Sequence, residues 1–288
     1  MAAPGSALIF LFSYVPMFGL ILAFKNFRYD KGIFGSDWCG LDNFKFFFTS
    51  QDAWRVTRNT LLLNIIFIVT TLIVSLAVAL VLYQITNRIF IKLYQTMIFV
   101  PYFLSMAVVA FVVYAFLNVD MGVVNNILKK LGLDPVMWYA RADLWPGLLT
   151  GINLWKNLGY YVLVYYAALM GLDASCFEAA EMDGAAKWQT MVKIAIPMIA
   201  PVIIVMLLLQ IGKIFYSDFG LFYLVTRNSG SLYSTVDVID TYIFRALRVS
   251  GDIGVSAAVG MYQSVVGFVL VLISNLLIKR YDPDSALF

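Results

Sequence analysis

Polar side chains that can bind a solute stand inside three of the most apolar stretches of this chain. In the first of these stretches they recur at intervals of three and four residues, which places them on one face of an α-helix. Amides, hydroxyls and an ammonium group can hydrogen-bond a polar solute, and aromatic rings offer it an apolar surface. The pattern therefore predicts a pathway that binds its solute without covalent chemistry. The candidate residues are Asn153, Lys156, Asn157 and Tyr160, then Gln210, Lys213, Tyr216 and Asp218, and finally Gln263.

A structural role is the alternative for each of these residues taken singly. Asparagine and glutamine often hydrogen-bond between membrane helices, where one bond contributes about 0.6 to 2 kcal/mol. Lys213 has Asp218 nearby in the sequence as an available ion-pair partner. Ionisable groups inside a membrane segment are functional candidates by default, because lipid cannot solvate them. We therefore interpret the set as the wall of a pathway and keep the packing role open for any one member.

The composition places most of the chain in a membrane. Hydrophobic residues make up 62% of the 288 residues and charged residues 13%, whereas a soluble domain has roughly 25% charged residues. The net charge of +3 comes from scattered basic residues, so we expect no nucleic-acid partner. Because there is no histidine, and Cys39 and Cys176 lie far apart, we expect no metal site and exclude a histidine-dependent catalytic triad.

Apolar stretches long enough to cross the hydrocarbon, which takes about 20 helical residues, alternate with polar connections. We expect an all-α membrane protein with six transmembrane helices and a single transmembrane domain over residues 5–278. The first stretch has no basic residue before it, so we interpret it as a retained helix rather than a signal peptide. We also expect a cytoplasmic leader to precede it in a longer chain. The expected spans are 5–24, 60–83, 95–117, 146–171, 198–224 and 254–278.

The connection between the fourth and fifth spans, residues 172–197, contains the charged and alanine-rich stretch EAAEMDGAAKWQTMVKIAIP. Ser175 and Glu178 have the spacing of a capping box, which predicts the start of a helix. Gly184 predicts a break before a second helix over about 185–196. On physical grounds alone, this connection is either a solvated hairpin or an element that docks onto another protein.

Counts of lysine and arginine do not fix the orientation in the membrane. If both termini are inside, the inside loops 84–94, 172–197 and 279–288 hold six of these residues and the outside loops hold twelve. The outside loops are also about twice as long, so the charge density is similar on both sides. Another signal must decide the orientation.

The charged stretch resembles the EAA motif of the permease subunits of ABC importers. Glu178-Ala179-Ala180 is followed by three residues, Gly184, nine residues and then Ile-Ala-Ile-Pro, with Ile196 where the family usually has leucine. Further stretches resemble the carbohydrate permeases, of the oligosaccharide and polysaccharide type. They are GLDNF (40–44), WRVTRNTL (54–61), VIDTYIFR (238–245) and GDIGVSAAVGMYQSVV (251–266), so the similarity runs over nearly the whole chain.

The resemblance implies a permease fold like that of the type I importers, with a cytoplasmic coupling helix that inserts into an ATP-binding subunit. It assigns that contact to Glu178, Ala179, Ala180 and Gly184. It also implies a bacterial plasma (inner) membrane location with both termini cytoplasmic. The implied partners are a second homologous permease, two ATP-binding subunits and an extracytoplasmic solute-binding protein. The chain has no G-x-x-x-x-G-K-[ST] phosphate loop, so we expect it to be no enzyme and to bind no cofactor, with ATP and Mg on the partner ATPase subunits.

The function expected from this resemblance is translocation of an oligosaccharide by alternating access. Two mid-span lysines, Lys156 and Lys213, would favour an acidic sugar such as a uronate oligosaccharide. Prolines 197 and 201 and glycines 212 and 220 predict that the fifth span can bend. The alternatives are a permease for amino acids or peptides, a secondary transporter driven by an ion gradient, and a membrane scaffold without a pathway. A secondary transporter would be expected to show inverted repeats and discontinuous helices around an ion site.

Overall fold

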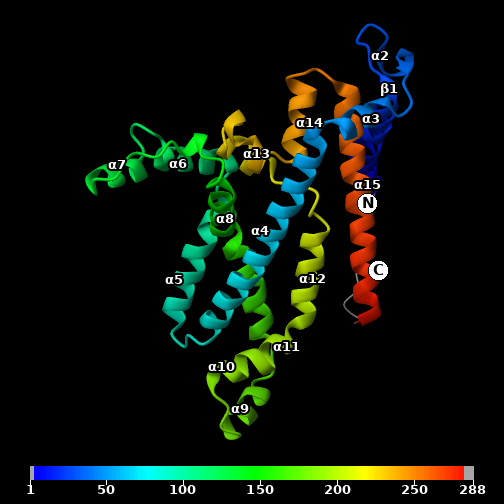
Figure 1. Ribbon diagram of the computed structural model, residues 1–288. Helices are drawn as coiled ribbons and strands as arrows, with labels where there is room; N and C mark the ends of the chain where they lie inside the picture. The colour runs from blue at the N-terminus through cyan, green and yellow to red at the C-terminus, as the bar shows by residue number, and fades with distance from the viewer. Residues whose placement is uncertain (1–2, 282–288) are drawn as a thin grey trace.

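The computed structural model describes residues 3–281, which form a helical bundle with one short pair of strands (Figure 1). The helices of the first half of the chain are α1 (Ala3–Ile9, continued by helical turns Phe10–Tyr14 and Val15–Phe24), α2 (Gly32–Gly35), α3 (Asp42–Thr49), α4 (Gln51–Tyr83), α5 (Arg88–Phe99), α6 (Met106–Leu117) and α7 (Val123–Lys130). Those of the second half are α8 (Trp145–Met170), α9 (Ala174–Met182), α10 (Lys187–Thr190), α11 (Ile196–Met198), α12 (Ala200–Ile211), α13 (Tyr233–Val236), α14 (Ile239–Arg248) and α15 (Ile253–Tyr281). Short turns of 3-10 or π-helix are Val100–Phe103, Trp138–Ala140, Met191–Ala195, Gly220–Val225 and Gly230–Leu232. Strands β1 (Lys25–Asn26) and β2 (Asp37–Trp38) pair antiparallel.

Three helices of the described chain are long and apolar enough to cross a membrane unbroken, namely Pro4–Phe24, Gln51–Tyr83 and Ile253–Arg280. Three further candidate spans are pairs of helices that meet at a bend of 100°, 74° or 64°. The pairs are Arg88–Phe103 with Met106–Leu117, Trp145–Met170 with Ala174–Met182, and Lys187–Met198 with Ala200–Ile211. If each bent pair is one span, residues 3–281 hold six spans, as the sequence predicts.

The helix expected over 95–117 is divided in the structure. The chain tightens into a 3-10 turn at Val100–Phe103 and then turns by 100° into α6. Pro101 has no N–H to continue the hydrogen bonding of α5. Ser105 starts the next helix, because its hydroxyl accepts the N–H of Val108 at 3.3 Å. The third span expected over 95–117 is therefore broken by this turn instead of being one continuous helix.

The helix expected over 198–224 is also interrupted. Helix α12 ends at Ile211, and residues 212–219 run irregularly to the turn at Gly220–Val225. At its start α12 meets the preceding helical segment at 64°. Pro201 lies in the first turn of α12, where a missing N–H removes no hydrogen bond. Pro197 lies near the end of the helical segment Lys187–Met198, just after the π-helical turn Met191–Ala195. The bend expected from the prolines is therefore present, and the break lies between the two glycines at 212 and 220.

Helices α4 and α8 pack against each other at the centre of the bundle. Helix α8 buries Trp145, Leu149 and Tyr165 completely, and α4 buries Leu63 and Phe67 in the same interior. Helix α5 lies close to α8 because position 159 is glycine. A Cβ there would lie 2.4 Å from the carbonyl oxygen of residue 98.

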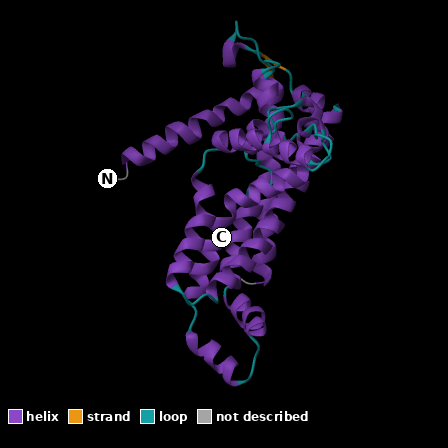
Figure 2. Ribbon diagram, turned by 90° about the vertical axis from the view of Figure 1, so that its left-hand side faces the viewer, coloured by secondary structure: helices purple, strands orange, loops and turns teal. Residues whose placement is uncertain are grey.

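The bundle has two distinct ends (Figure 1). Helices α9 and α10 form one end, which we call the α9 end, and β1 and α2 lie at the opposite end, the β1 end. Helix α15 runs from the β1 end toward the α9 end (Figure 1), and the N-terminal helix extends obliquely sideways from the β1 end, away from the bundle (Figure 2). Helices α6 and α7 extend sideways from the top of α8 (Figure 1).

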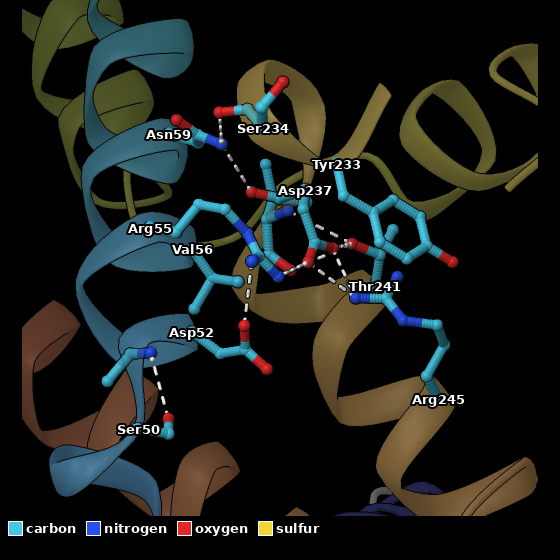
Figure 3. A network of polar contacts seen from close by, with 12 residues as sticks. Ser50, Asp52, Arg55, Val56, Asn59, Tyr233, Ser234, Asp237, Thr241 and Arg245 are labelled. Carbon is cyan, nitrogen blue, oxygen red and sulfur yellow. Dashed lines mark hydrogen bonds and ion pairs between the residues drawn. The ribbon is translucent and has the colours of Figure 1, made fainter. Parts of the chain in front are cut away.

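A buried carboxylate joins α4 to the segment around α13 and α14 (Figure 3). The side chain of Asp237 is fully buried, and Arg245 donates to both of its oxygens at 2.6 and 2.7 Å. Arg55 of α4 donates to the same carboxylate at 3.0 Å, and Thr241 donates at 2.9 Å. The amide of Asn59 reaches the Asp237 carbonyl oxygen at 3.1 Å. Because a buried charge without partners is strongly unfavourable, these contacts hold the two segments together as a unit.

We expect the change Asp237→Asn to destabilise the chain strongly. It leaves two arginines around a neutral amide, and breaking a buried ion pair in this way costs about 3–5 kcal/mol. The thermal unfolding midpoint of the purified chain in detergent measures the effect. The matched control is Arg141→Gln, which breaks the exposed Arg141–Asp143 pair and should change the midpoint little. Equal midpoints for the two variants would contradict a stabilising role for Asp237.

Candidate functional site

A cavity of about 610 Å³ opens among α4, α8, α12 and the irregular segment 212–219. Its wall mixes amides, hydroxyls, aromatic rings, one lysine and one aspartate with apolar side chains. The lining residues are Asn64, Phe67, Ile68, Thr71, Tyr102, Asn153, Asn157, Tyr160, Tyr161, Met206, Leu209, Gln210, Lys213, Ile214, Tyr216, Ser217 and Asp218.

The cavity brings together seven of the nine pathway candidates predicted from the sequence. Helix α8 supplies three of them, which lie at intervals of three and four residues along one face, and the chain around the end of α12 supplies four. The seven residues are Asn153, Asn157, Tyr160, Gln210, Lys213, Tyr216 and Asp218. The other two candidates, Lys156 and Gln263, do not line it.

Lys156 binds the break between α5 and α6 instead of facing the cavity. Only 9% of the residue is exposed, and its Nζ donates to the carbonyl oxygens of Tyr102 at 3.1 Å and Leu104 at 2.6 Å. Those carbonyls belong to the 3-10 turn, where helical partners are missing. The expectation that Lys156 lies on the cavity face was wrong, because the open backbone at the break offers its ammonium group better partners than the cavity does.

Gln263 and Asp240 brace the break that follows α12. The Gln263 amide donates to the Phe215 carbonyl at 2.6 Å and to both oxygens of Asp240 at 3.1 Å. Asp240 in turn accepts the N–H of Ser217 at 2.8 Å. Burial raises the pKa of Asp240 above its usual value, against the opposing effect of these hydrogen bonds. Gln263 is thus a buried support behind the cavity wall and does not line the cavity, contrary to what its place among the pathway candidates implied.

Asn64 supports the same break from the other side. Its amide donates to the Ile214 carbonyl at 2.9 Å and to the Ser217 hydroxyl at 3.1 Å. Side chains from α4, α14 and α15 therefore fix the irregular segment that presents Lys213, Tyr216 and Asp218 to the cavity.

The available partner of Lys213, Asp218, does not pair with it. Among residues 3–281 no ion pair involves Lys213, and Asp218 accepts the N–H of Leu221 at 3.1 Å. The ammonium group of Lys213 therefore remains available at the cavity wall. Gln210 is a further unmatched group, since its buried Nε2 makes no hydrogen bond among the described residues. A buried donor without a partner is unfavourable by about 1–3 kcal/mol, so a solute or water that reaches it gains that interaction.

Several wall residues were not among the sequence-based candidates. Asn64 and Thr71 are polar residues in the mainly apolar part of α4, and the rule that selected Asn153 would have found them. Tyr102 enters the wall only because the chain breaks after α5, and its ring stacks on that of Tyr160 at 5.3 Å. No local pattern in the sequence predicts the contact between Tyr102 and Tyr160.

The charged connection forms the α9 end of the molecule. Helix α9 begins at a cap made by Asp173, whose carboxylate accepts the N–H of Ser175 at 3.0 Å. This bond lowers the pKa of Asp173. The predicted capping box between Ser175 and Glu178 was therefore wrong, because Asp173 already occupies the cap position. Glu178 lies in the exposed part of α9.

Gly184 ends α9 in the left-handed conformation, with φ of +75°. The Ala185 N–H bonds the Ala180 carbonyl at 3.0 Å, which closes the helix end. The second helix starts at Lys187, two residues later than expected, and continues without a break to Met198. Ala179 is exposed and Ala180 is buried at 8% exposure, so of the two alanines only Ala179 is freely accessible.

Known proteins similar to this chain come from bacterial transport systems. The protein LplB of Bacillus subtilis is 34% identical over 98% of this chain and 88% of its own length. The polygalacturonan/rhamnogalacturonan transport system permease protein YteP of the same organism is 32% identical over 99% of this chain and 88% of its own length.

Chains in two solved structures of alginate transporters share the fold of this chain over nearly its full length. A chain of a bacterial ABC transporter involved in the import of the acidic polysaccharide alginate superposes with a TM-score of 0.89, at 32% identity over 97% of this chain and 93% of that chain. In the complex of the alginate transporter with an alginate pentasaccharide-bound periplasmic protein, the TM-score is 0.88 at the same identity, over 98% of this chain and 93% of that chain.

A family match defines the chain more directly than any single relative. Residues 72–283, which include the last third of α4 and all of α8, α9 and α12, match the family described as binding-protein-dependent transport system inner membrane component. The matched part contains the EAA stretch and most of the cavity wall. The chain is therefore a membrane-spanning ABC importer permease, and it belongs to the family of binding-protein-dependent transport system inner membrane components.

Proposed function

We propose that this chain translocates an oligosaccharide that an extracytoplasmic solute-binding protein delivers to it. The observation that carries the proposal is the cavity wall, where amides and hydroxyls alternate with tyrosine rings and a lysine that has no ion-pair partner among residues 3–281. Sugar hydroxyls pair with such amides, and the apolar faces of sugar rings pack on aromatic side chains. Transport of polygalacturonan or alginate by the relatives supports a sugar as the solute.

The proposed assembly places the other functions on separate chains. A second homologous permease would complete the pathway, and two ATP-binding subunits would bind ATP and Mg. This chain lacks a phosphate-binding loop in its sequence, which supports the proposal that it binds no cofactor itself. The complex of the alginate transporter with its periplasmic protein supports a solute-binding protein as a partner.

The proposed topology has both termini and the α9 end on the cytoplasmic side of a bacterial plasma membrane. Helix α15 ends toward the α9 end, which supports this side for the C-terminal end of the domain (Figure 1). Glu178, Ala179, Ala180 and Gly184 would then meet the ATP-binding subunit. Since Ala180 is mostly buried, it would contribute by keeping α9 close to its neighbours rather than by direct contact.

The geometry offers a route from the coupling contact to the cavity. Helix α9 follows α8 directly, and the helical segment from Lys187 leads into α12 through the 64° bend. A push on α9 and α10 would therefore reach both α8 and α12, which form two walls of the cavity. Such motion would switch the pathway between inward- and outward-facing states.

Uptake into proteoliposomes separates this proposal from its alternatives. The complete transporter should import an oligosaccharide only with its solute-binding protein and ATP. Import of amino acids or peptides instead would support the other class of permease. Uptake that follows an ion gradient and needs no ATP would support a secondary transporter and overturn the proposal.

Lys213 makes an acidic oligosaccharide the best-fitting solute, since its ammonium group has no ion-pair partner in the described part of the chain. We expect Lys213→Met to raise the KM for a uronate oligosaccharide by about tenfold or more, because a charge-assisted hydrogen bond contributes roughly 1.5–3 kcal/mol. The KM for a neutral sugar of the same length should change little, and Lys213→Arg should preserve the preference for the acidic sugar. Lys156→Met is the matched control, and it should lower thermal stability without altering the acidic-to-neutral ratio. If Lys213→Met leaves the ratio of the KM for the acidic sugar to the KM for the neutral sugar unchanged, the acidic-solute proposal is wrong.

Gly184 should be needed for coupling rather than for membrane insertion. Gly184→Val forces a branched side chain into the left-handed region, which disturbs the end of α9 although a Cβ there meets nothing within 4 Å. We expect the variant to insert and assemble while more ATP is hydrolysed for each sugar imported. The matched control is Gly132→Val, because Gly132 also has φ of +75° and open space around it, but lies after α7. An unchanged ratio of ATP to sugar in Gly184→Val would contradict the coupling role.

A further inference from the structure

A second cavity, of about 530 Å³, lies beside α6 and is separate in its lining from the first. One face of α6 supplies Phe111, Tyr114 and two alanines to its wall. The turn after residue 219 supplies Tyr223 and a leucine, and the residues that follow supply Arg227 and Asn228. No residue of the proposed sugar site belongs to this wall.

The two cavities lie along the same two segments of the chain. One segment passes from Tyr102 in the first cavity to the start of α6, and the other passes from Asp218 to Tyr223. Between the two cavities the segments touch at Gly220, where a Cβ would lie 2.5 Å from the Cβ of Met106. The second cavity therefore follows the first along the chain, at the level of α6 and away from the α9 end (Figure 1).

Several hydrogen-bond donors in the wall of the second cavity have no acceptor among residues 3–281. The Arg227 guanidinium stacks over the ring of Tyr114 at 4.0 Å and forms no ion pair or side-chain hydrogen bond among residues 3–281. In the same described part of the chain, the hydroxyls of Tyr114 and Tyr223 and the Nδ2 of Asn228 have no hydrogen-bonded partner either. A positive charge surrounded by free donors is suited to an anionic ligand that is rich in acceptors.

The backbone holds these donors in a fixed place. Arg227 and Asn228 have φ of 57° and 48°, an uncommon conformation for residues other than glycine. The Asn228 N–H bonds the Tyr223 carbonyl at 3.0 Å, and the Asn228 Oδ1 accepts the Tyr233 hydroxyl at 2.8 Å. Arg245, which binds the buried Asp237, reaches the same Oδ1 at 3.4 Å. The buried ionic network is therefore connected to Asn228, the residue next to Arg227.

We propose that this cavity is a second subsite for an acidic sugar unit, occupied on the way to the first cavity. This inference rests on the proposed function and adds to it a position and a residue. Arg227 would bind the sugar carboxylate, and the hydroxyls of Tyr114 and Tyr223 would bind ring oxygens or hydroxyls. Phe111, which is 77% exposed, would offer its ring to the apolar face of the sugar.

The wall favours a sugar over an anionic phospholipid. Four of its eight residues are donors, namely Tyr114, Tyr223, Arg227 and Asn228. A lipid would need one charged contact at its headgroup and a long apolar groove for its acyl chain. The apolar part of this wall consists of two alanines, one phenylalanine and one leucine, which covers a ring better than a chain.

The test uses the complete transporter in proteoliposomes with its solute-binding protein. The probes are pentagalacturonate and its fully methyl-esterified, neutral counterpart. We expect Arg227→Met to raise the KM for pentagalacturonate by about tenfold, the change expected from loss of one charge-assisted contact, and to leave the KM for the ester unchanged. Arg227→Lys should restore most of the loss. The matched control Arg248→Met removes another exposed arginine, at the end of α14 and outside both cavities, and should have no effect.

Three outcomes would overturn the subsite. They are an equal effect of Arg227→Met on both probes, no effect on either, and loss of a copurified phospholipid in the variant with sugar uptake unchanged.

The subsite and the proposed function fail in different ways. If the wild-type transporter imports pentagalacturonate and Arg227→Met does so equally well, only the subsite fails. If the wild type imports neither probe, equilibrium binding of labelled pentagalacturonate decides. Binding that Arg227→Met weakens and Arg248→Met does not would keep the subsite and reject the transport function, and absence of such binding would reject both.

Discussion

The hydrocarbon of a membrane provides no hydrogen-bond partner, and this constraint governs where the helices of this chain can break. A helix that ends inside the bundle leaves carbonyl groups without partners, and lipid cannot replace them. In this protein side chains from other helices meet the break after α5 and the break after α12. Lys156 of α8 donates to two carbonyls after α5, and Asn64 and Gln263 donate to the backbone after α12. The breaks are therefore supported parts of the fold.

The cavity exists because of these supported breaks. Unbroken helices would fill the space between α4, α8 and α12 with regular side-chain packing. The irregular segment 212–219 instead turns Lys213, Tyr216 and Asp218 toward that space, while Asp240 and Gln263 hold it from behind. The residues that shape the site are thus different from the residues that line it, and both sets are polar for different reasons.

The two ends of the molecule are built differently. At the β1 end the Asp237 network joins α4 to α14 with buried charges, and through Asn228 it also fixes the wall of the second cavity. At the α9 end the connections are short helices with exposed surfaces, joined by a left-handed glycine. Under the proposed function this difference is useful, because the α9 end must engage and follow another protein. The first cavity lies on the helices that connect to the α9 end, and the second lies next to the ionic network.

The sequence by itself determined the membrane class, the six candidate spans and the family, because apolar length and the spacing of the EAA stretch are local properties of the chain. Seven of the nine residues that it singled out for a pathway line one cavity in the structure, since polar side chains inside apolar helices are conspicuous. Only the tertiary structure decided that Lys156 and Gln263 turn away from the cavity. It also decided that the chain breaks after α5 and after α12, within the third and fifth expected spans. The physical reason is that a polar side chain inside a membrane protein must find a hydrogen-bond partner within the protein. The partners of Lys156 and Gln263 are carbonyls and a carboxylate from segments distant in sequence. Local spacing shows which face of a helix a residue occupies. It does not show which backbone carbonyls near that face lack a hydrogen-bond partner within their own helix.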